Sequence, residues 1–112
     1  MKIITHPEQP ITENIHIADG VFVKAFRVPK KGTILPQHSH QYSHTSYIAA
    51  GAVHLWADGE DMGEIRAPRG VLIEAHTKHL FVITEDNTMI LCIHATEHAD
   101  AIAEHHEIAG DE

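Results

Sequence analysis

The chain has 112 residues, of which 43% are hydrophobic, and its 16 acidic residues against 8 Lys and Arg give a formal net charge of -8. This length suits one domain, and the hydrophobic fraction is that of a globular rather than a disordered protein. Basic residues do not cluster beyond Lys30–Lys31, which argues against a surface that binds nucleic acid. No apolar run approaches the ~20 residues of a membrane span, and Met1–Thr5 does not resemble a signal peptide, so a cytoplasmic protein without a membrane partner is expected.

Most of the chain reads as short strands separated by turns. Asp19-Gly20 and Asp58-Gly59 are typical of tight hairpin turns, and Glu60, Asp61 and Glu64 are predicted to extend the second turn into solvent. The predicted strands are Ile15–Ile17, Val21–Val28, Thr33–Leu35, Thr45–Ala50, Ala52–Ala57, Val71–Glu74, Leu80–Thr84 and Thr88–His94. Short strands with frequent turn signals predict an all-β antiparallel sandwich or barrel.

Only the end of the chain departs from this pattern. The stretch His98 to Ile108 is rich in Ala and Glu and predicts one short C-terminal helix, over about residues 98–108. No linker, repeat or low-complexity block divides the chain, so residues 1–112 are predicted to form a single domain. The one cysteine, Cys92, lies in an apolar run and is predicted to be a buried small hydrophobe rather than a nucleophile.

Twelve scattered histidines are the unusual feature of the composition. His38 and His40 are two residues apart, so in an extended strand both point to the same face, and His44 keeps the same parity beyond a possible bend. His79 stands at the start of an apolar strand, with His76 as its nearest rival. Neutral imidazole suits Fe, Ni, Cu and Zn, so the pattern predicts one divalent transition-metal ion bound by His38, His40, His44 and His79.

The first half of the chain resembles the first cupin motif, G-x5-H-x-H-x3,4-E-x6-G. Gly32 is followed by five residues and His38, then by His40 after one more, and Gly51 closes the motif at the usual spacing. His44 occupies the position of the usual Glu.

The stretch Ile73–His79 resembles the core of the second cupin motif, G-x5-P-x-G-x2-H-x3-N. His79 then takes the position of the histidine ligand, whereas Glu74 replaces the Pro, His76 the Gly and Ile83 the final Asn. The second motif is eroded, which leaves the choice between His76 and His79 open.

The resemblance covers about residues 21–94 and implies a cupin jelly-roll barrel of six to eight strands with an ion inside. It implies metal ligands at His38, His40 and His79, with His44 at the position of the Glu ligand, and a homodimer paired through edge strands. Four neutral imidazoles would leave a divalent ion at +2, which favours an anionic chelating substrate. Such a set leaves two positions open in an octahedral field, and none in a tetrahedral zinc site.

Three further residues are candidates for acid–base or substrate-binding roles. His54 and His94 each lie on a strand, where either one could face the cavity or the outer surface, and Tyr42 could donate a hydrogen bond to a substrate.

The favoured function is a metal-dependent enzyme acting on a small oxygen-rich substrate: a carbonyl compound, enol, uronate or carboxylate. Fe with oxygen would give a dioxygenase, and Ni, Mn or Zn would give isomerisation, cyclisation or lyase chemistry. The alternative is a non-catalytic module that binds a small molecule or a metal.

Overall fold

The computed structural model describes residues 11–36 and 39–96 of the chain. This part contains nine β-strands and no helix. The strands are β1 (Thr12–Ala18), β2 (Val21–Val28), β3 (Ile34–Pro36), β4 (His44–Ala50), β5 (Ala52–Ala57), β6 (Glu60–Arg66), β7 (Arg69–Ile73), β8 (His79–Ile83) and β9 (Thr88–Ala95). The predicted C-terminal helix lies outside the described residues. No helix long and apolar enough to cross a membrane occurs within those two ranges.

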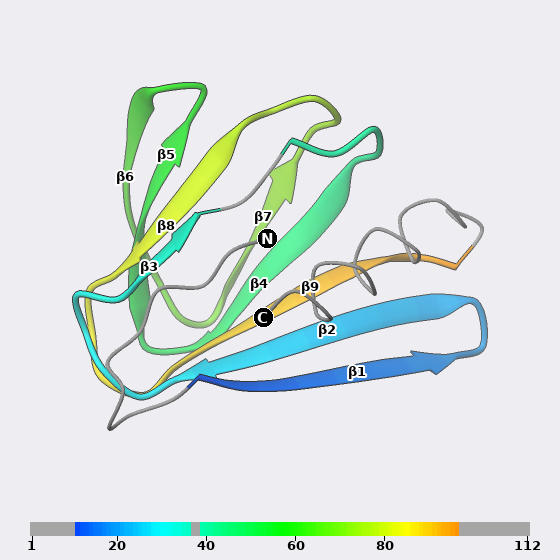
Figure 1. Cartoon of the computed structure of the whole chain (residues 1–112), viewed down its shortest axis with the longest axis horizontal. Helices are drawn as coiled ribbons and strands as arrows, with labels where there is room; N and C mark the ends of the chain where they lie inside the picture. The colour runs from blue at the N-terminus through cyan, green and yellow to red at the C-terminus, as the bar shows by residue number, and fades with distance from the viewer. Residues whose placement is uncertain (1–10, 37–38, 97–112) are drawn as a thin grey trace.

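The strands form two antiparallel sheets (Figure 1). One sheet has the order β1-β2-β9-β4-β7 and the other the order β3-β8-β5-β6. Successive strands often change sheet, as β2 to β3 and β4 to β5 do, and this combination of hairpins and crossovers is typical of a jelly roll. The all-β prediction is confirmed, with more strands than the six to eight that the family resemblance implied.

Eight of the nine strands lie where the sequence predicted them: β2 and β5 have the predicted bounds, and the others have ends shifted by at most three residues. Glu60, Asp61 and Glu64 are exposed, as predicted, but the prediction of a turn was wrong, because these residues belong to strand β6. Most of β6 is exposed and only Ile65 is buried, so its sequence has no alternation of apolar and polar residues. It is an edge strand held by backbone pairing to β5, and a charged edge strand needs no apolar face.

The core lies between the two sheets and follows from period-two alternation along the strands. In β9 every second residue from Thr88 to His94 is buried, and in β2 the same is true from Phe22 to Val28. The buried apolar cluster draws on both sheets and comprises Phe26, Val28, Leu35, Ile48, Val53, Leu55, Ile65, Ile73, Phe81, Ile83, Ile90 and Cys92. Cys92 is therefore a buried core residue, as predicted.

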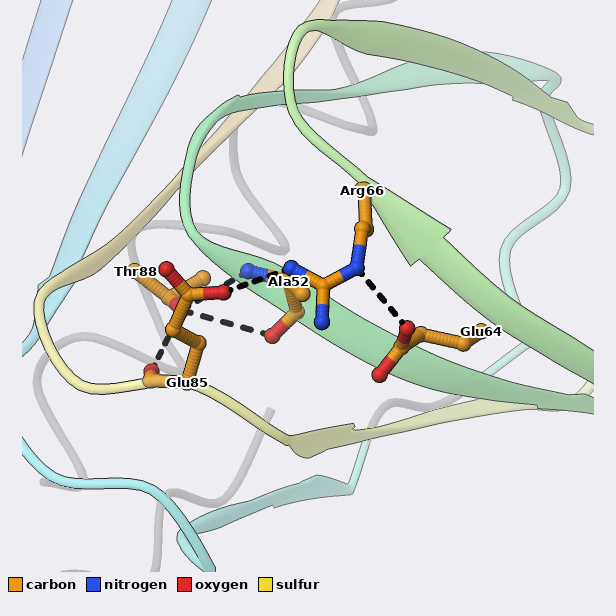
Figure 2. A network of polar contacts seen from close by, with 5 residues as sticks. All are labelled: Ala52, Glu64, Arg66, Glu85 and Thr88. Atoms are coloured by element: carbon orange, nitrogen blue, oxygen red, sulfur yellow. Dashed lines mark hydrogen bonds and ion pairs between the residues drawn. The ribbon is translucent and has the colours of Figure 1, made fainter.

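A polar network joins the two sheets at the turn between β4 and β5 (Figure 2). The Thr88 hydroxyl donates to the carbonyl of Glu85 at 2.7 Å, and its oxygen accepts a hydrogen bond from the Ala52 amide at 3.2 Å. Gly51 forms the turn with a φ of +79°, directly against Thr88. This network lies beside the end of β4 opposite His44, about 20 Å, one strand length, away.

Candidate metal centre

Three buried histidines from separate parts of the chain face one another at the start of β4. His40 lies in the loop after β3, and His44 and His79 are the first residues of β4 and β8. Their exposed fractions are only 6%, 5% and 2%. Ring centroids are 5.4 Å apart for His40 and His44, 5.2 Å for His44 and His79, and 6.1 Å for His40 and His79.

These spacings suit rings that share one ion. With a metal–nitrogen distance of about 2.1 Å, a ring centre lies about 3.2 Å from the ion, so two bound rings have centroids about 4.5 to 6.4 Å apart. Within residues 11–36 and 39–96, however, no three His, Cys, Asp or Glu side chains are already positioned to hold an ion. The ring centres are thus spaced for shared coordination, although a complete set of three donors is not in place among these residues.

A buried donor atom supports the fit to a metal. The Nδ1 atom of His44 is buried and has no hydrogen-bond partner, although a buried polar atom normally has one. In His79, Nδ1 lies 3.4 Å from the carbonyl of Thr77 and can donate to it, which leaves Nε2 as the unprotonated nitrogen. Imidazole nitrogens of this kind are the donors that Fe, Ni, Cu and Zn accept.

The strands determine which way these side chains point. Along β4 the alternation buries His44, Ser46 and Ile48 on the inner face, and along β8 it buries His79 with Phe81. The amide of His76 donates to the carbonyl of His40 at 2.6 Å, which ties the loop before β8 to the His40 backbone.

Burial favours the neutral form of His44 and His79. Burial, together with the charges of the neighbouring His79, His40 and His94, lowers the pKa of His44 to about 3. Burial also lowers the pKa of His79 to about 4, partly offset by the bond to Thr77 and reinforced by His40. At neutral pH both rings are unprotonated, which is the form that binds a metal.

Tyr42 and His94 lie at the same end of the barrel. Both are 7% exposed, and their rings are 4.9 Å apart, as are those of Tyr42 and His40. Phe22 stacks on His94 with centroids 4.5 Å apart. The Nδ1–H of His94 donates to the carbonyl of Ala95 at 2.9 Å, so Nε2 is the proton-accepting nitrogen of the neutral ring.

The structure places the other sequence candidates elsewhere. The face of His54, left open by the sequence, is the outer one: Val53 and Leu55 are the buried residues of β5, and His54 packs beside Trp56. There its Nε2 lies 2.5 Å from a carboxylate oxygen of Asp61. His76 is exposed, so His79 is the downstream histidine that joins the cluster. His38 lies outside the described residues.

One buried lysine was not singled out from the sequence. Lys24 has no exposed surface and lies on the inner face of β2 between Phe22 and Phe26. The signal was present, because Lys24 has the same parity in its strand as these two aromatic residues.

Comparisons with known proteins rest on structure alone, since no protein-family model and no curated protein matches the chain. The chain is similar to KdgF from Halomonas sp., with a TM-score of 0.65 and 16% identity over 83% of this chain and 84% of that one. It is also similar to a cupin superfamily protein from Desulfitobacterium hafniense DCB-2, with a TM-score of 0.67 and 15% identity over 82% and 83% of the two chains. For an RmlC-like cupin from Shewanella frigidimarina NCIMB 400 the values are 0.63 and 18%, over 82% and 81%. At these identities the likeness establishes the fold alone.

Proposed function

We propose that this chain, which has the cupin fold, binds one divalent transition-metal ion through His40, His44 and His79 and acts on a small oxygen-rich molecule. The proposal rests on one observation: three buried imidazoles face one another, and one of them has a buried nitrogen without a hydrogen-bond partner. His38 is the fourth proposed ligand, on its two-residue spacing from His40 and on the motif resemblance. The candidate metals are Fe, Ni, Zn, Mn and Cu.

The electrostatics of the cluster favour an anionic or strongly polarised ligand. Among the described residues, no carboxylate contributes to the pKa shift of His44 or His79, so these donors are neutral and carry no compensating charge. A bound divalent ion would supply Lewis-acid polarisation of a carbonyl or enol oxygen or, in the case of iron, oxygen chemistry.

His94 and Tyr42 are the residues proposed to handle protons and orient the substrate. The bond from His94 Nδ1 to the Ala95 carbonyl holds the ring in one orientation and leaves Nε2 to accept a proton. The Tyr42 ring packs against both His94 and His40, which supports a role for its hydroxyl group as a hydrogen-bond donor to the substrate. Isomerisation, cyclisation, lyase and dioxygenase chemistry all fit such a pair beside a metal.

A non-catalytic binding module is the second candidate, and the tight packing of the cluster favours it. None of the buried histidines is more than 7% exposed, so exchange of substrate requires movement of the surrounding residues. The relaxation rate of solvent water protons, measured on the protein loaded with Mn or Cu, separates the two candidates. A catalytic site needs a metal position that water can exchange into, so it should raise this rate, whereas a closed binding site should not.

Elemental analysis of the untagged protein tests the metal site. We expect about one equivalent of one transition metal in the wild type, and its loss in His44→Gln and His79→Gln. His76→Gln is the matched control, because His76 is exposed and lies only three residues from His79. A protein that holds no metal as purified, and takes up none when Fe, Ni, Zn, Mn or Cu is added, contradicts the proposal. Equal loss in the His76 control would also contradict it.

A further inference from the structure

Lys24 is a buried cation without a hydrogen-bond partner. The side chain has an exposed fraction of 0%, and its Nζ atom is buried and makes no hydrogen bond. Lysine is almost never fully buried unless it is paired, because removing an unpaired ammonium group from water is costly. Phe26 faces the ammonium, with its ring centroid 5.3 Å from Nζ, but this contact leaves the three N–H donors without an acceptor.

The strand register places Lys24 next to the histidine end of the barrel. Lys24 pairs with Cys92, which in turn pairs with Ser46, so these three side chains form one row on the inner face of the larger sheet. Two residues further along β2 and β9, Phe22 pairs with His94. Lys24 therefore lies one inward-facing row deeper than His94, about 7 Å along the strands.

No negative charge compensates Lys24 in the described part of the chain. Burial raises the pKa of the Cys92 thiol to about 11, so this neighbour is neutral at physiological pH. The nearest carboxylate in the strand register is Glu13, which pairs with Phe26, but no ion pair joins it to Lys24. Glu13 Oε1 is itself buried without a hydrogen-bond partner. Lys24 is also the only Lys or Arg among the buried residues of the described ranges.

We propose that Lys24 is the receptor for a carboxylate group of the ligand that enters at the histidine end. This inference rests on the proposed function and narrows its substrate class to small carboxylates that carry a second oxygen, such as a keto or hydroxyl oxygen, a few bonds away. The carboxylate accepts hydrogen bonds from the ammonium group, and the second oxygen faces the row of His44 and His94.

The proposed ligand would approach Lys24 from the histidine end. His40, Tyr42 and His94 keep 6% to 7% of their surface exposed, whereas Lys24 and Phe26 keep none. The ammonium group now lies over Phe26, so binding requires it to turn toward the histidine row. Lysine has four rotatable side-chain bonds, so the proposed movement is one of side-chain torsions.

Isothermal titration of the full chain, with and without added Ni, tests the proposal. The probes are pyruvate and malonate, with pyruvamide as the uncharged match of pyruvate. We expect the wild type to bind the carboxylates and to prefer pyruvate to pyruvamide. In Lys24→Met, which keeps the length and loses the charge, carboxylate affinity should fall about ten- to one-hundred-fold. Glu13→Gln should bind at least as tightly as the wild type, because it removes the one acidic neighbour in register with this face.

A second measurement needs no ligand. If Lys24 waits for an external anion, Lys24→Met removes an unpaired buried charge and should melt at a higher temperature than the wild type. A lower melting temperature for Lys24→Met would mean that Lys24 is satisfied within the chain, and would overturn the proposal. So would equal affinity of the wild type for pyruvate and pyruvamide, or no binding of either carboxylate at millimolar concentration.

The same data separate this inference from the metal proposal. If the wild type binds no metal but prefers carboxylates through Lys24, the proposed function fails and the anion receptor stands. If metal binds at His44 and His79 while Lys24→Met leaves carboxylate affinity unchanged, the metal site stands and the anion receptor fails. Lys24→Met should keep the metal content of the wild type in either case.

Discussion

Acidification should lower the free energy of unfolding of the metal-free protein, because His44 and His79 are buried in their neutral forms. In the unfolded chain both titrate near a pKa of about 6.5, whereas the folded state lowers the pKa values to about 3 and about 4. Between these limits the unfolded state binds a proton at each position and the folded state does not. Their contribution is therefore complete above about pH 6.5, and is lost as the pH falls toward 4 for His79 and 3 for His44.

The expected loss is large compared with the stability of a small domain. Between about pH 7 and about pH 5, each histidine lowers the free energy of unfolding by about 2 kcal/mol, so the pair accounts for about 4 kcal/mol. Total stabilities of small proteins are typically about 5–15 kcal/mol. These two histidines alone thus account for the loss of a substantial part of the free energy of unfolding within two pH units.

Urea unfolding followed by far-UV circular dichroism, in the presence of a chelator, measures this loss. His44→Gln should lose about 2 kcal/mol less than the wild type between the same pH values, whatever its stability at pH 7. His16→Gln is the control, because His16 is exposed on β1, and it should behave as the wild type. The reasoning is refuted if the wild type keeps its stability at pH 5, or if His44→Gln loses as much as the wild type.

Two further predictions concern the core and the turns. Gly51→Ala should lower stability by at least about 2 kcal/mol in thermal melts, because a Cβ would lie 2.2 Å from Thr88 Oγ1 and 2.8 Å from Thr88 Cα. Gly59→Ala has the same φ of +79° but open space around the new atom, so its loss should be about 1 kcal/mol, and equal losses would contradict the steric argument. Cys92, buried and with a pKa raised to about 11, should react with a thiol reagent only in denaturant, and rapid labelling of the native protein would show that the buried position is wrong.

The strand pattern was readable because it is local. In Val21–Val28 and Thr88–His94, alternation of inward and outward residues follows from the period of two in an extended chain, and Gly-containing turns mark the ends. Strand β6 escaped the prediction because an exposed edge strand is held by backbone bonds to its neighbour and not by its own apolar face.

The candidate site was predictable in part. Parity and motif spacing selected His40, His44 and His79, and the structure brings these three rings within 6.1 Å of one another. The face of His54 could not be read, because both sets of alternating residues in β5 contain large apolar side chains, Val53 with Leu55 and Trp56 beside His54. Pairing with β8 and β6 decided that Val53 and Leu55 face the core.

Lys24 shows most clearly what each level determined. The sequence by itself placed Lys24 on the same side of its strand as Phe22 and Phe26, because neighbours two apart in a strand share a face. Only the tertiary structure decided that this side closes on the barrel interior, with Cys92 in register and His94 one row away. Local geometry determines which residues share a face, whereas the pairing of strands distant in the chain determines what that face meets.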